Sequence, residues 1–305
     1  MEVITALDYK MTDDTAVTVG KFDGIHKGHD LLTEKLLQQE KTGLKSLLFT
    51  FDVSPRIRLA KDNTKQLITN KERMNLLEKQ GISYMVQCPF EEIMSYEPEE
   101  FVKLLVNQFR MKYLVCGTDF HFGKMGKGDI FLLQKLSKKY DFRLEVVEKL
   151  KQDNRDISST YVREEISKGN VSVANELLGY HYFIWGTVVH GRHLGTKIGI
   201  PTINLIPPEN KLLPKNGVYV TLVEMEHKTY HGVTNVGTKP TVDGTGVVGV
   251  ETHILDFEQD VYEKKVCVYF LEHLRDEIRF ESVEELKNQM SKDKKKALLY
   301  FNKEN

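Results

Sequence analysis

The chain has 305 residues, which is long for one hydrophobic core and predicts two domains. Its 43 Lys and Arg residues balance 44 Asp and Glu residues, and the net charge of -1 argues against capture of nucleic acid or anionic membrane by charge alone. Cys88, Cys116 and Cys267 form no paired motif, and the sequence shows neither a secretory signal nor a bilayer-spanning apolar run, so we expect a cytoplasmic protein with free thiols.

The first prominent motif is a turn rich in glycine and histidine. Residues 16–19 are apolar, residues 20–29 read GKFDGIHKGH, and leucines then follow at helical spacing. We predict a strand, a tight turn and a helix. A helix that begins here points unpaired N–H groups and the positive end of its dipole into the turn.

This turn has the composition of a phosphate site. Gly20, Gly24 and Gly28 have no Cβ to keep a phosphate away from the backbone. His26 and His29 can donate hydrogen bonds to phosphate oxygens. We therefore predict a nucleotide-phosphate site without a Walker-type lysine. The alternative is a glycine-rich connection that carries two surface histidines.

The first half alternates strands and helices, which predicts a mostly parallel sheet covered by helices. In such sheets, ligands bind beyond the carboxyl ends of the strands, where residues 20–29 and the loop after Cys116 would both lie. The further strands are expected at 45–51, 82–87, 113–116 and 143–147, and the helices at 67–80 (with a capping box of Thr69 and Glu72), 98–109 and 129–140.

Two later segments of this half have polar or aromatic side chains suited to a nucleotide. Residues 117–123 read GTDFHFG, in which two aromatic rings could stack on a flat ring or, equally well, pack on the core. Residues 157–163 read ISSTYVR at the start of a helix. Their hydroxyls can cap the helix, and Arg163 follows one turn later with a bidentate fork for phosphate.

The composition changes after a short helix predicted at 171–178, and we place the domain boundary near residues 179–182. Strand-like segments separated by turns predict a small antiparallel barrel, with strands expected at 183–190, 218–223, 248–255 and 265–270. Ser282 and Glu285 begin a closing helix. The predicted domains are therefore 1–180 and 181–305.

Residues 201–204 read PTIN and form a candidate cation site in this second half. Pro201 presets a turn, and Thr202 and Asn204 present a hydroxyl and an amide oxygen on one side of an extended segment. Both oxygens could bind one hard cation. The tetrapeptide alone favours the alternative, a turn that satisfies its own backbone.

The motifs of the first half resemble those of FAD synthetases, which belong to the HxGH nucleotidyltransferase superfamily. Residues 22–29, 117–123 and 157–163 match the FDGxHxGH, GxDFxFG and ISSTxxR motifs in the family's order. The resemblance implies a Rossmann-like fold in which His26 and His29 stabilise the triphosphate. It also implies ATP and phosphate contacts from Gly20, Phe22, Asp23, Gly24, Gly28, Ser159, Thr160 and Arg163, and flavin or nucleotide contacts from Gly117, Asp119, Phe120 and Phe122.

The second half resembles riboflavin kinases. Residues 186–205 contain the PTxN motif, and residues 217–219, 232–241 and 250–257 match further segments. The resemblance implies that Glu251 is the catalytic base and that Thr202 and Asn204 help to bind Mg²⁺ and ATP. It further implies nucleotide or flavin contacts from Gly191, Gly199, Pro201, Asn235 and the flap residue Arg275.

The resemblance covers nearly the whole chain and implies a bifunctional riboflavin kinase/FAD synthetase. Such an enzyme converts riboflavin and ATP to FMN and ADP, and then FMN and ATP to FAD and pyrophosphate, with no nucleic-acid or membrane partner. Two departures, Ser54 in place of a histidine and Thr196 in place of an arginine, leave a monofunctional enzyme as one alternative. Another is a flavin- or nucleotide-binding regulator, which the balanced charge disfavours. The sequence leaves the oligomeric state open.

Overall fold

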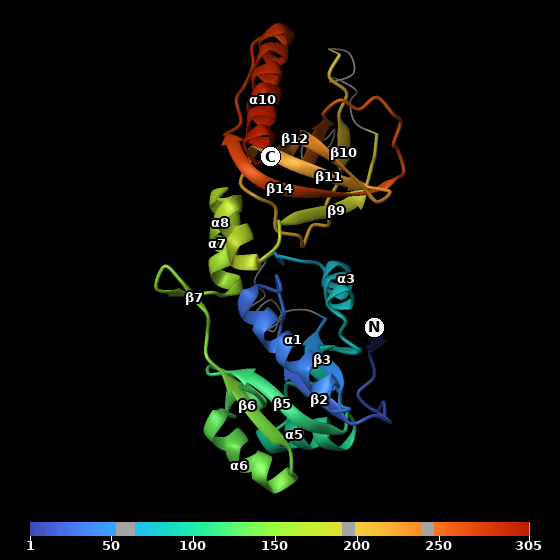
Figure 1. The fold of residues 1–305 in the computed structure, drawn as a ribbon, viewed down its shortest axis with the longest axis vertical. Helices are drawn as coiled ribbons and strands as arrows, with labels where there is room; N and C mark the ends of the chain where they lie inside the picture. Colours follow the sequence, from blue (N-terminus) through green and yellow to red (C-terminus); the bar gives the residue numbers. More distant parts are fainter. Residues whose placement is uncertain (53–64, 191–198, 240–246, 305) are drawn as a thin grey trace. The chain divides into compact units, whose positions relative to one another are not determined.

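The structure is a computed structural model that describes residues 1–52, 65–190, 199–239 and 247–304. Its backbone contacts divide the chain into two compact units, Met1–Ser159 and Thr160–Asn305 (Figure 1). This division comes earlier than the boundary predicted near 179–182. The physical reason is that α8 (Val171–Leu178) packs on the barrel of the second unit, where Asn175 Nδ2 donates to the Phe270 carbonyl at 2.8 Å.

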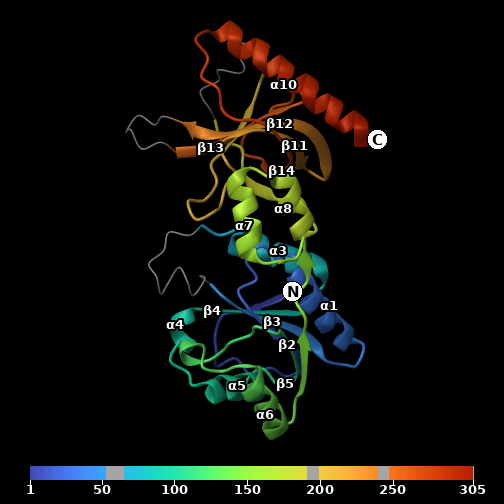
Figure 2. The same ribbon diagram turned by 90° about the vertical axis from the view of Figure 1, so that its left-hand side faces the viewer.

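The first unit contains one six-stranded parallel sheet in the order β1-β4-β3-β2-β5-β6, as predicted. The helices that follow its strands lie on both faces (Figure 2). The strands are β1 (Glu2–Ile4), β2 (Thr15–Val19), β3 (Lys45–Phe51), β4 (Tyr84–Cys88), β5 (Met111–Gly117) and β6 (Arg143–Val147). The helices are α1 (Lys27–Glu40), α3 (Asn70–Gln80), α4 (Phe90–Ile93), α5 (Pro98–Asn107), α6 (Ile130–Tyr140) and the short 3-10 helix η1 (Lys124–Gly126), and β7 (Lys151–Gln152) pairs with β8 (Arg155–Asp156).

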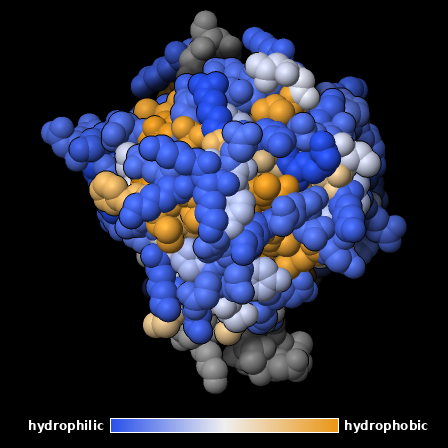
Figure 3. All heavy atoms as spheres, turned by 90° about the horizontal axis from the view of Figure 1, so that it is seen from below, coloured by the Kyte–Doolittle hydropathy of each residue, from blue (hydrophilic) through white to orange (hydrophobic). Residues whose placement is uncertain are grey.

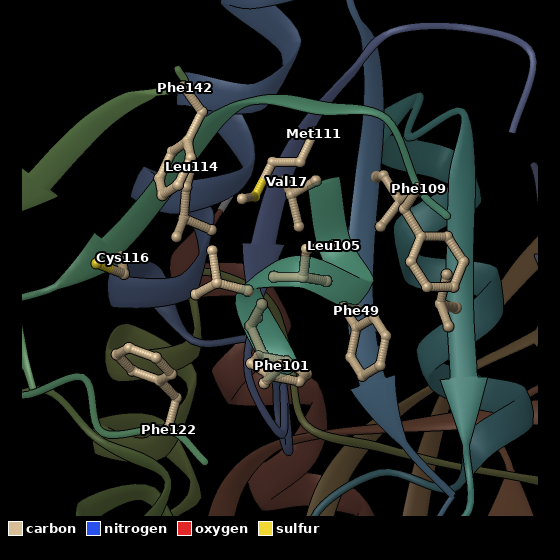
Figure 4. Close-up of a cluster of buried hydrophobic side chains, with 14 of the residues drawn as sticks. Val17, Phe49, Phe101, Leu105, Phe109, Met111, Leu114, Cys116, Phe122 and Phe142 are labelled. Carbon is tan, nitrogen blue, oxygen red and sulfur yellow. The ribbon is translucent and has the colours of Figure 1, made fainter. Parts of the chain in front are cut away.

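Alternate residues of each central strand enter two different cores, because successive side chains of a strand point to opposite faces. Val17 of β2 packs with Phe101 and Leu105 of α5 in the core shown in Figure 4, whereas Ala16 packs with Leu36 of α1 on the other face. The sheet is therefore buried on both faces, which explains why its strands are continuous apolar runs in the sequence.

The connections of this sheet place a topological switch point between β2 and β5. From β2 the chain moves to β3 and then β4 on one side, whereas β5 and β6 lie on the other side. Ligands of open α/β sheets bind at such a point, beyond the carboxyl ends of the strands. Residues 20–26 follow β2 and the loop 117–123 follows β5, so both predicted segments flank the switch point.

The second unit contains a six-stranded antiparallel sheet in the order β10-β13-β12-β11-β14-β9. Its two ends are joined where the Val189 N–H donates to the Asn204 carbonyl at 2.9 Å, which nearly closes the predicted barrel. The strands are β9 (Phe183–Thr187), β10 (Ile203–Leu205), β11 (Gly217–Met225), β12 (Lys228–Lys239), β13 (Val247–Ile254) and β14 (Lys265–Arg275), and the helices are α7 (Ser159–Lys168, whose first residue belongs to the first unit), α8 and α10 (Val283–Glu304).

Helix α10 covers part of this barrel and begins as predicted. The Ser282 hydroxyl accepts a hydrogen bond from the Glu285 N–H at 3.1 Å. Ala297 and Phe301 of α10 pack against Val220 of β11. Strand β12 was not predicted, because glycine and polar residues weaken its local strand signal; it is held by pairing with β11 on one side and β13 on the other.

The surface seen in Figure 3 is mostly hydrophilic and carries only small hydrophobic groups. In the first unit, Met125 and Phe131 are the most exposed of the large hydrophobic side chains that the structure describes. Within the described ranges, no helix combines the length and apolar character needed to cross a membrane. Cys88 and Cys116 are free and buried, and burial raises the pKa of each thiol to about 12.

Candidate active sites

The first candidate site is the turn between β2 and α1. Helix α1 begins at Lys27, and its N-cap residue His26 has an extended backbone. The His26 carbonyl accepts hydrogen bonds from the N–H groups of His29 and Asp30, at 2.7 and 3.1 Å. The His26 side chain makes no capping hydrogen bond, and α1 begins directly after the turn, so the positive end of its dipole lies at the turn.

The backbone of this turn is strained at two bulky residues. Phe22 has φ 48° and Ile25 has φ 35°, a left-handed region that non-glycine residues adopt at a cost of about 1–2 kcal/mol each. Both side chains are fully buried in the core between the sheet and α1. The buried side chains hold the turn in this conformation, and such strain typically occurs where geometry serves a ligand.

The two imidazoles lie face to face at the start of α1. The rings of His26 and His29 stack with centroids 3.8 Å apart, and the Phe22 ring lies 4.6 Å from that of His29. The Nδ1 atoms of both histidines are buried and have no hydrogen-bond partner among the described residues. Buried polar atoms without a partner are rare in folded proteins, and here they lie at the predicted phosphate site.

Burial lowers the pKa of His26 to about 4, and burial together with the neighbouring His26 lowers the pKa of His29 well below its usual value. Both imidazoles are therefore neutral at neutral pH. A neutral imidazole still donates one hydrogen bond, so the predicted role toward phosphate requires no positive charge.

We expect the His26 ring of the ligand-free protein to remain neutral from about pH 8 to about pH 5, whereas an unperturbed histidine has a pKa of about 6.5. Because the unfolded chain binds this proton near pH 6.5 and the folded chain only near pH 4, the free energy of unfolding decreases as the pH falls from 6.5 to 4. NMR titration of the ring resonances, assigned with a His26→Gln variant, measures this directly. A midpoint at the unperturbed value would contradict it.

Two glycines of the turn make room for rings of the turn itself. A Cβ on Gly28 would lie 3.2 Å from His26 Nδ1, and one on Gly20 would lie 3.0 Å from the Phe22 ring. The missing side chains therefore make room for the rings of the turn itself. Gly24, with φ 93°, supplies a left-handed backbone that glycine adopts without strain.

Ser159, which is far from the turn in the sequence, contacts it through a hydrogen bond. Its hydroxyl donates to the Asp23 carbonyl at 2.7 Å. The Asp23 carboxylate accepts hydrogen bonds from the N–H groups of Leu67 and Ile68, at 2.8 and 3.3 Å. Thr160 and Arg163 follow in α7 and belong to the second compact unit.

Some residues of the loop 117–123 lie in the core and others lie at the surface. Phe122 is 5% exposed, lies in the core with Phe101 and stacks on Phe120, so the packing alternative holds for its ring. Gly117 ends β5, and the Asp119 carboxylate pairs with Lys149 Nζ at 2.8 Å. Of the four predicted loop residues, only Phe122 is fully buried.

The second candidate site is a row of polar side chains across three barrel strands. Asn204 of β10 and Asn235 of β12 each lie directly opposite Glu251 of β13. The Thr202 hydroxyl donates to Glu251 Oε1 at 2.6 Å. The sheet register therefore brings together residues that are far apart in the sequence, and the oxygens of Thr202 and Glu251 are in direct contact.

The PTIN segment is also held to β13 by a second contact, between His253 Nδ1 and the Pro201 carbonyl at 2.8 Å. Because Glu251 and His253 are two residues apart, they lie on the same face of the strand. Gly199 has φ 78°, a left-handed backbone conformation that favours glycine. The predicted residue Gly191 and the departures at Ser54 and Thr196 lie outside the described residues.

The structure places Arg275 in a buried ion pair. Its guanidinium donates from Nε and one terminal nitrogen to Asp293 of α10, at 3.0 and 2.8 Å, and Gln289 also donates to this carboxylate. The Arg275 and Asp293 side chains are 15% and 2% exposed. This pair fixes the end of β14 to α10. In the sequence, Asp293 lies in a charged stretch typical of an exposed helix.

We expect Asp293→Ala to destabilise the second unit by about 3 kcal/mol, because it leaves a buried guanidinium without its partner. Lys294→Ala is the matched control on the same helix; it removes the exposed pair with Asp256, and we expect a loss of at most about 1 kcal/mol. Denaturant unfolding followed by tryptophan fluorescence measures both, since Trp185, the one tryptophan, lies in β9. Equal losses in the two variants would contradict the prediction.

Comparisons with known proteins match both halves of the chain. A riboflavin kinase family model matches residues 178–301, and an FAD synthetase family model matches residues 8–161. The bifunctional riboflavin kinase/FMN adenylyltransferase of Escherichia coli K12 is 35% identical over 93% of this chain and 92% of its own length. The protein of the same name from Bacillus subtilis is 35% identical over 94% and 92%. A solved structure titled macrolide-efflux protein, from Streptococcus pneumoniae, has a TM-score of 0.87 and 32% identity over 97% of this chain and 98% of its own.

Proposed function

Because this chain belongs to the family of bifunctional riboflavin kinase/FMN adenylyltransferases, we propose that its two candidate sites divide the two reactions between them. The protein is a transferase that phosphorylates riboflavin with ATP to give FMN and ADP. It also adenylylates FMN with ATP to give FAD and pyrophosphate. The proposal concerns which residues carry out each reaction.

The turn between β2 and α1 is the proposed site of adenylyl transfer. An oxygen of the FMN phosphate attacks the α-phosphorus of ATP, and pyrophosphate leaves. The nucleophile is already an anion, so the site must mainly orient the reactants and stabilise charge on the phosphates. His26, His29 and the N-terminal N–H groups of α1 are donors available for this purpose, with Ser159, Thr160 and Arg163 proposed as further phosphate contacts.

The observation that carries this assignment is the pair of stacked imidazoles, 3.8 Å apart, at the N-terminus of α1. Asp119 and Phe120 are proposed to contact the flavin or nucleotide from the loop after β5, the neighbour of β2 in the sheet. Both segments follow strands that flank the switch point, where this type of sheet binds its ligands.

The row around Glu251 is the proposed riboflavin kinase site. The primary alcohol of riboflavin attacks the γ-phosphorus of ATP, and the Glu251 carboxylate accepts the alcohol proton. The Thr202 hydroxyl, 2.6 Å from Glu251 Oε1, orients this carboxylate. Asn204 and Asn235 lie opposite Glu251 and can contact the phosphates or the flavin, and Arg275 is proposed to support the flavin flap from the end of β14.

The oxygens of this row fit Mg²⁺. Thr202, Asn204 and Glu251 supply hydroxyl, amide and carboxylate oxygens, and Mg²⁺ in nucleotide sites is held by few protein oxygens together with phosphates and water. The residues that would hold it are Thr202 and Asn204. When bound, the ion neutralises charge on the phosphates of ATP.

A product assay tests the two activities separately. Chromatography distinguishes riboflavin, FMN and FAD after incubation of the purified protein with MgATP and either riboflavin or FMN. We expect FMN and then FAD from riboflavin, and FAD from FMN. Accumulation of FMN without FAD would identify a monofunctional kinase, and salt-sensitive RNA binding without turnover would favour a regulator.

The free thiols support the further proposal that the protein works in the cytoplasm. Cys88 and Cys116 are buried, and neither forms a disulfide among the residues that the structure describes. A reducing compartment maintains such thiols and supplies ATP. Fractionation of the native host and immunodetection of the protein would test this location.

A further inference from the structure

A buried arginine outside the motifs binds the backbone of the proposed adenylyl-transfer turn. Arg73 lies in the first turn of α3 and is 6% exposed. Its two terminal nitrogens donate to the carbonyls of Lys21 and Phe51, at 2.8 and 3.0 Å. Lys21 belongs to the turn after β2, and Phe51 ends the neighbouring strand β3. One guanidinium therefore ties the turn to the next strand of the sheet.

The orientation of this guanidinium is itself fixed. The Asn70 side chain accepts from Arg73 at 2.7 Å and donates to the Asp52 carbonyl at 3.0 Å. The start of α3 is set by the predicted capping box, in which the Thr69 hydroxyl accepts from the Glu72 N–H and the Glu72 carboxylate accepts from the Thr69 N–H. Arg73 therefore extends from a rigid helix start rather than from a loop.

The segment just before α3 holds the turn at a second point. The Asp23 carboxylate accepts from the N–H groups of Leu67 and Ile68, just before α3. Lys21 and Asp23 are thus both anchored, and the residue between them, Phe22, is the one with φ 48°. Its ring lies 4.6 Å from the ring of His29. Anchoring the two neighbours of Phe22 fixes a side chain that contacts the imidazole pair.

The chemistry of the contact requires an arginine. Burial lowers the pKa of Arg73 to about 10, while Asp23 and Asp52 oppose this shift, so the side chain is a cation at neutral pH. A planar fork can donate to two separate carbonyls at once, whereas a lysine ammonium is a point charge on a flexible stem. Its acceptors in the turn and in β3 are backbone carbonyls, so Arg73 acts there on the shape of the backbone.

We propose that Arg73 is a positioning residue for adenylyl transfer: by holding the carbonyls of Lys21 and Phe51, it keeps the strained turn in the conformation that presents His26 and His29 to the phosphates of ATP. The inference rests on the proposed function of the turn. It adds a residue from α3 that touches neither substrate nor the reacting atoms.

The test compares Arg73→Met and Arg73→Lys in the full-length protein. We expect Arg73→Met to lower kcat for FAD formation from FMN by about 10- to 100-fold, because small displacements of catalytic groups are costly, with a much smaller change in KM for ATP. Arg73→Lys recovers part of kcat, since one carbonyl can still be bound. Riboflavin kinase activity, which is assigned to the other unit, stays at the wild-type value and reports that the second unit is folded.

Lys79→Met is the matched control, because it removes an exposed cation from the same helix, and we expect wild-type kinetics. Amide hydrogen exchange adds a readout that is independent of activity. In Arg73→Met we expect faster exchange at residues 22–30 and unchanged protection in β3 and β5. Loss of protection across the whole sheet would overturn the proposal, because Arg73 would then serve the fold in general.

The outcomes separate this inference from the assignment of the turn. If His29→Ala abolishes FAD formation and Arg73→Met retains wild-type kcat, the positioning role is wrong and the turn assignment stands. If His29→Ala retains full FAD formation, the assignment of the turn fails, and the role proposed for Arg73 fails with it. A fall in kcat with Arg73→Met, partial recovery with Arg73→Lys and local loss of protection would support the proposal.

Discussion

Glu251→Gln is expected to abolish the formation of FMN from riboflavin and to leave the formation of FAD from supplied FMN unchanged. The amide oxygen of glutamine can still accept the hydrogen bond from Thr202, so the local geometry is retained. What is lost is the ability to accept the alcohol proton, and general-base catalysis contributes about 10²- to 10⁴-fold to such reactions. The fall should therefore appear in kcat for riboflavin phosphorylation.

Glu226→Gln is the matched control for this substitution. Glu226 lies in the same unit, is largely exposed and pairs with Lys264 at the surface, so its loss should not change either activity. Rates of FMN and FAD formation measured separately by chromatography give the result. Wild-type FMN formation by Glu251→Gln would remove Glu251 from its proposed role, and simultaneous loss of both activities in a folded protein would contradict the assignment of two sites.

His29→Ala is expected to have the reverse effect, with loss of FAD formation and wild-type formation of FMN. The substitution removes one donor and the stacking partner of His26, whose ring lies 3.8 Å away. Removal of one donor from a site that stabilises developing charge typically costs about 10²- to 10³-fold in kcat. Because His26 also loses its neighbour, we expect a decrease at the upper end of this range.

Two further variants help to explain the effect of His29→Ala. His29→Gln can still donate a hydrogen bond and should retain more activity than His29→Ala, if the imidazole acts as a neutral donor. His227→Asn changes an exposed histidine in a turn of the barrel unit and should have no effect. If the glutamine and alanine variants were equally inactive at every pH tested, hydrogen-bond donation alone would not account for the role of His29.

The low pKa values of the two imidazoles also bear on the reaction. Neutral rings at the helix N-terminus avoid repulsion between two stacked cations in the absence of nucleotide. A polyphosphate nearby favours their protonated forms, because opposite charges attract. Binding of ATP and uptake of protons are therefore expected to be linked, which calorimetry in buffers of different ionisation enthalpy would detect.

Local sequence patterns were enough to predict much of this protein's organisation. Continuous apolar runs between helical segments predicted the parallel sheet, and alternating short strands predicted the barrel; both predictions are confirmed. The capping residues Thr69 and Ser282 correctly marked two helix starts. These features could be predicted because they depend on residues within one or two turns of each other. The motifs also identified the family, since each keeps its order and spacing along the chain.

Contacts between residues far apart in the sequence became visible only in the folded protein. The pairing of β2 with β5 placed the switch point beside residues 20–26, and the barrel register set Asn204 and Asn235 opposite Glu251. Arg73 and Asp293 resemble exposed helix charges in the sequence, and only packing shows that both are buried. Likewise, Phe122 proved to be a core residue. Local patterns contain no information on these contacts, because burial and hydrogen bonding between elements depend on how the whole sheet and barrel pack.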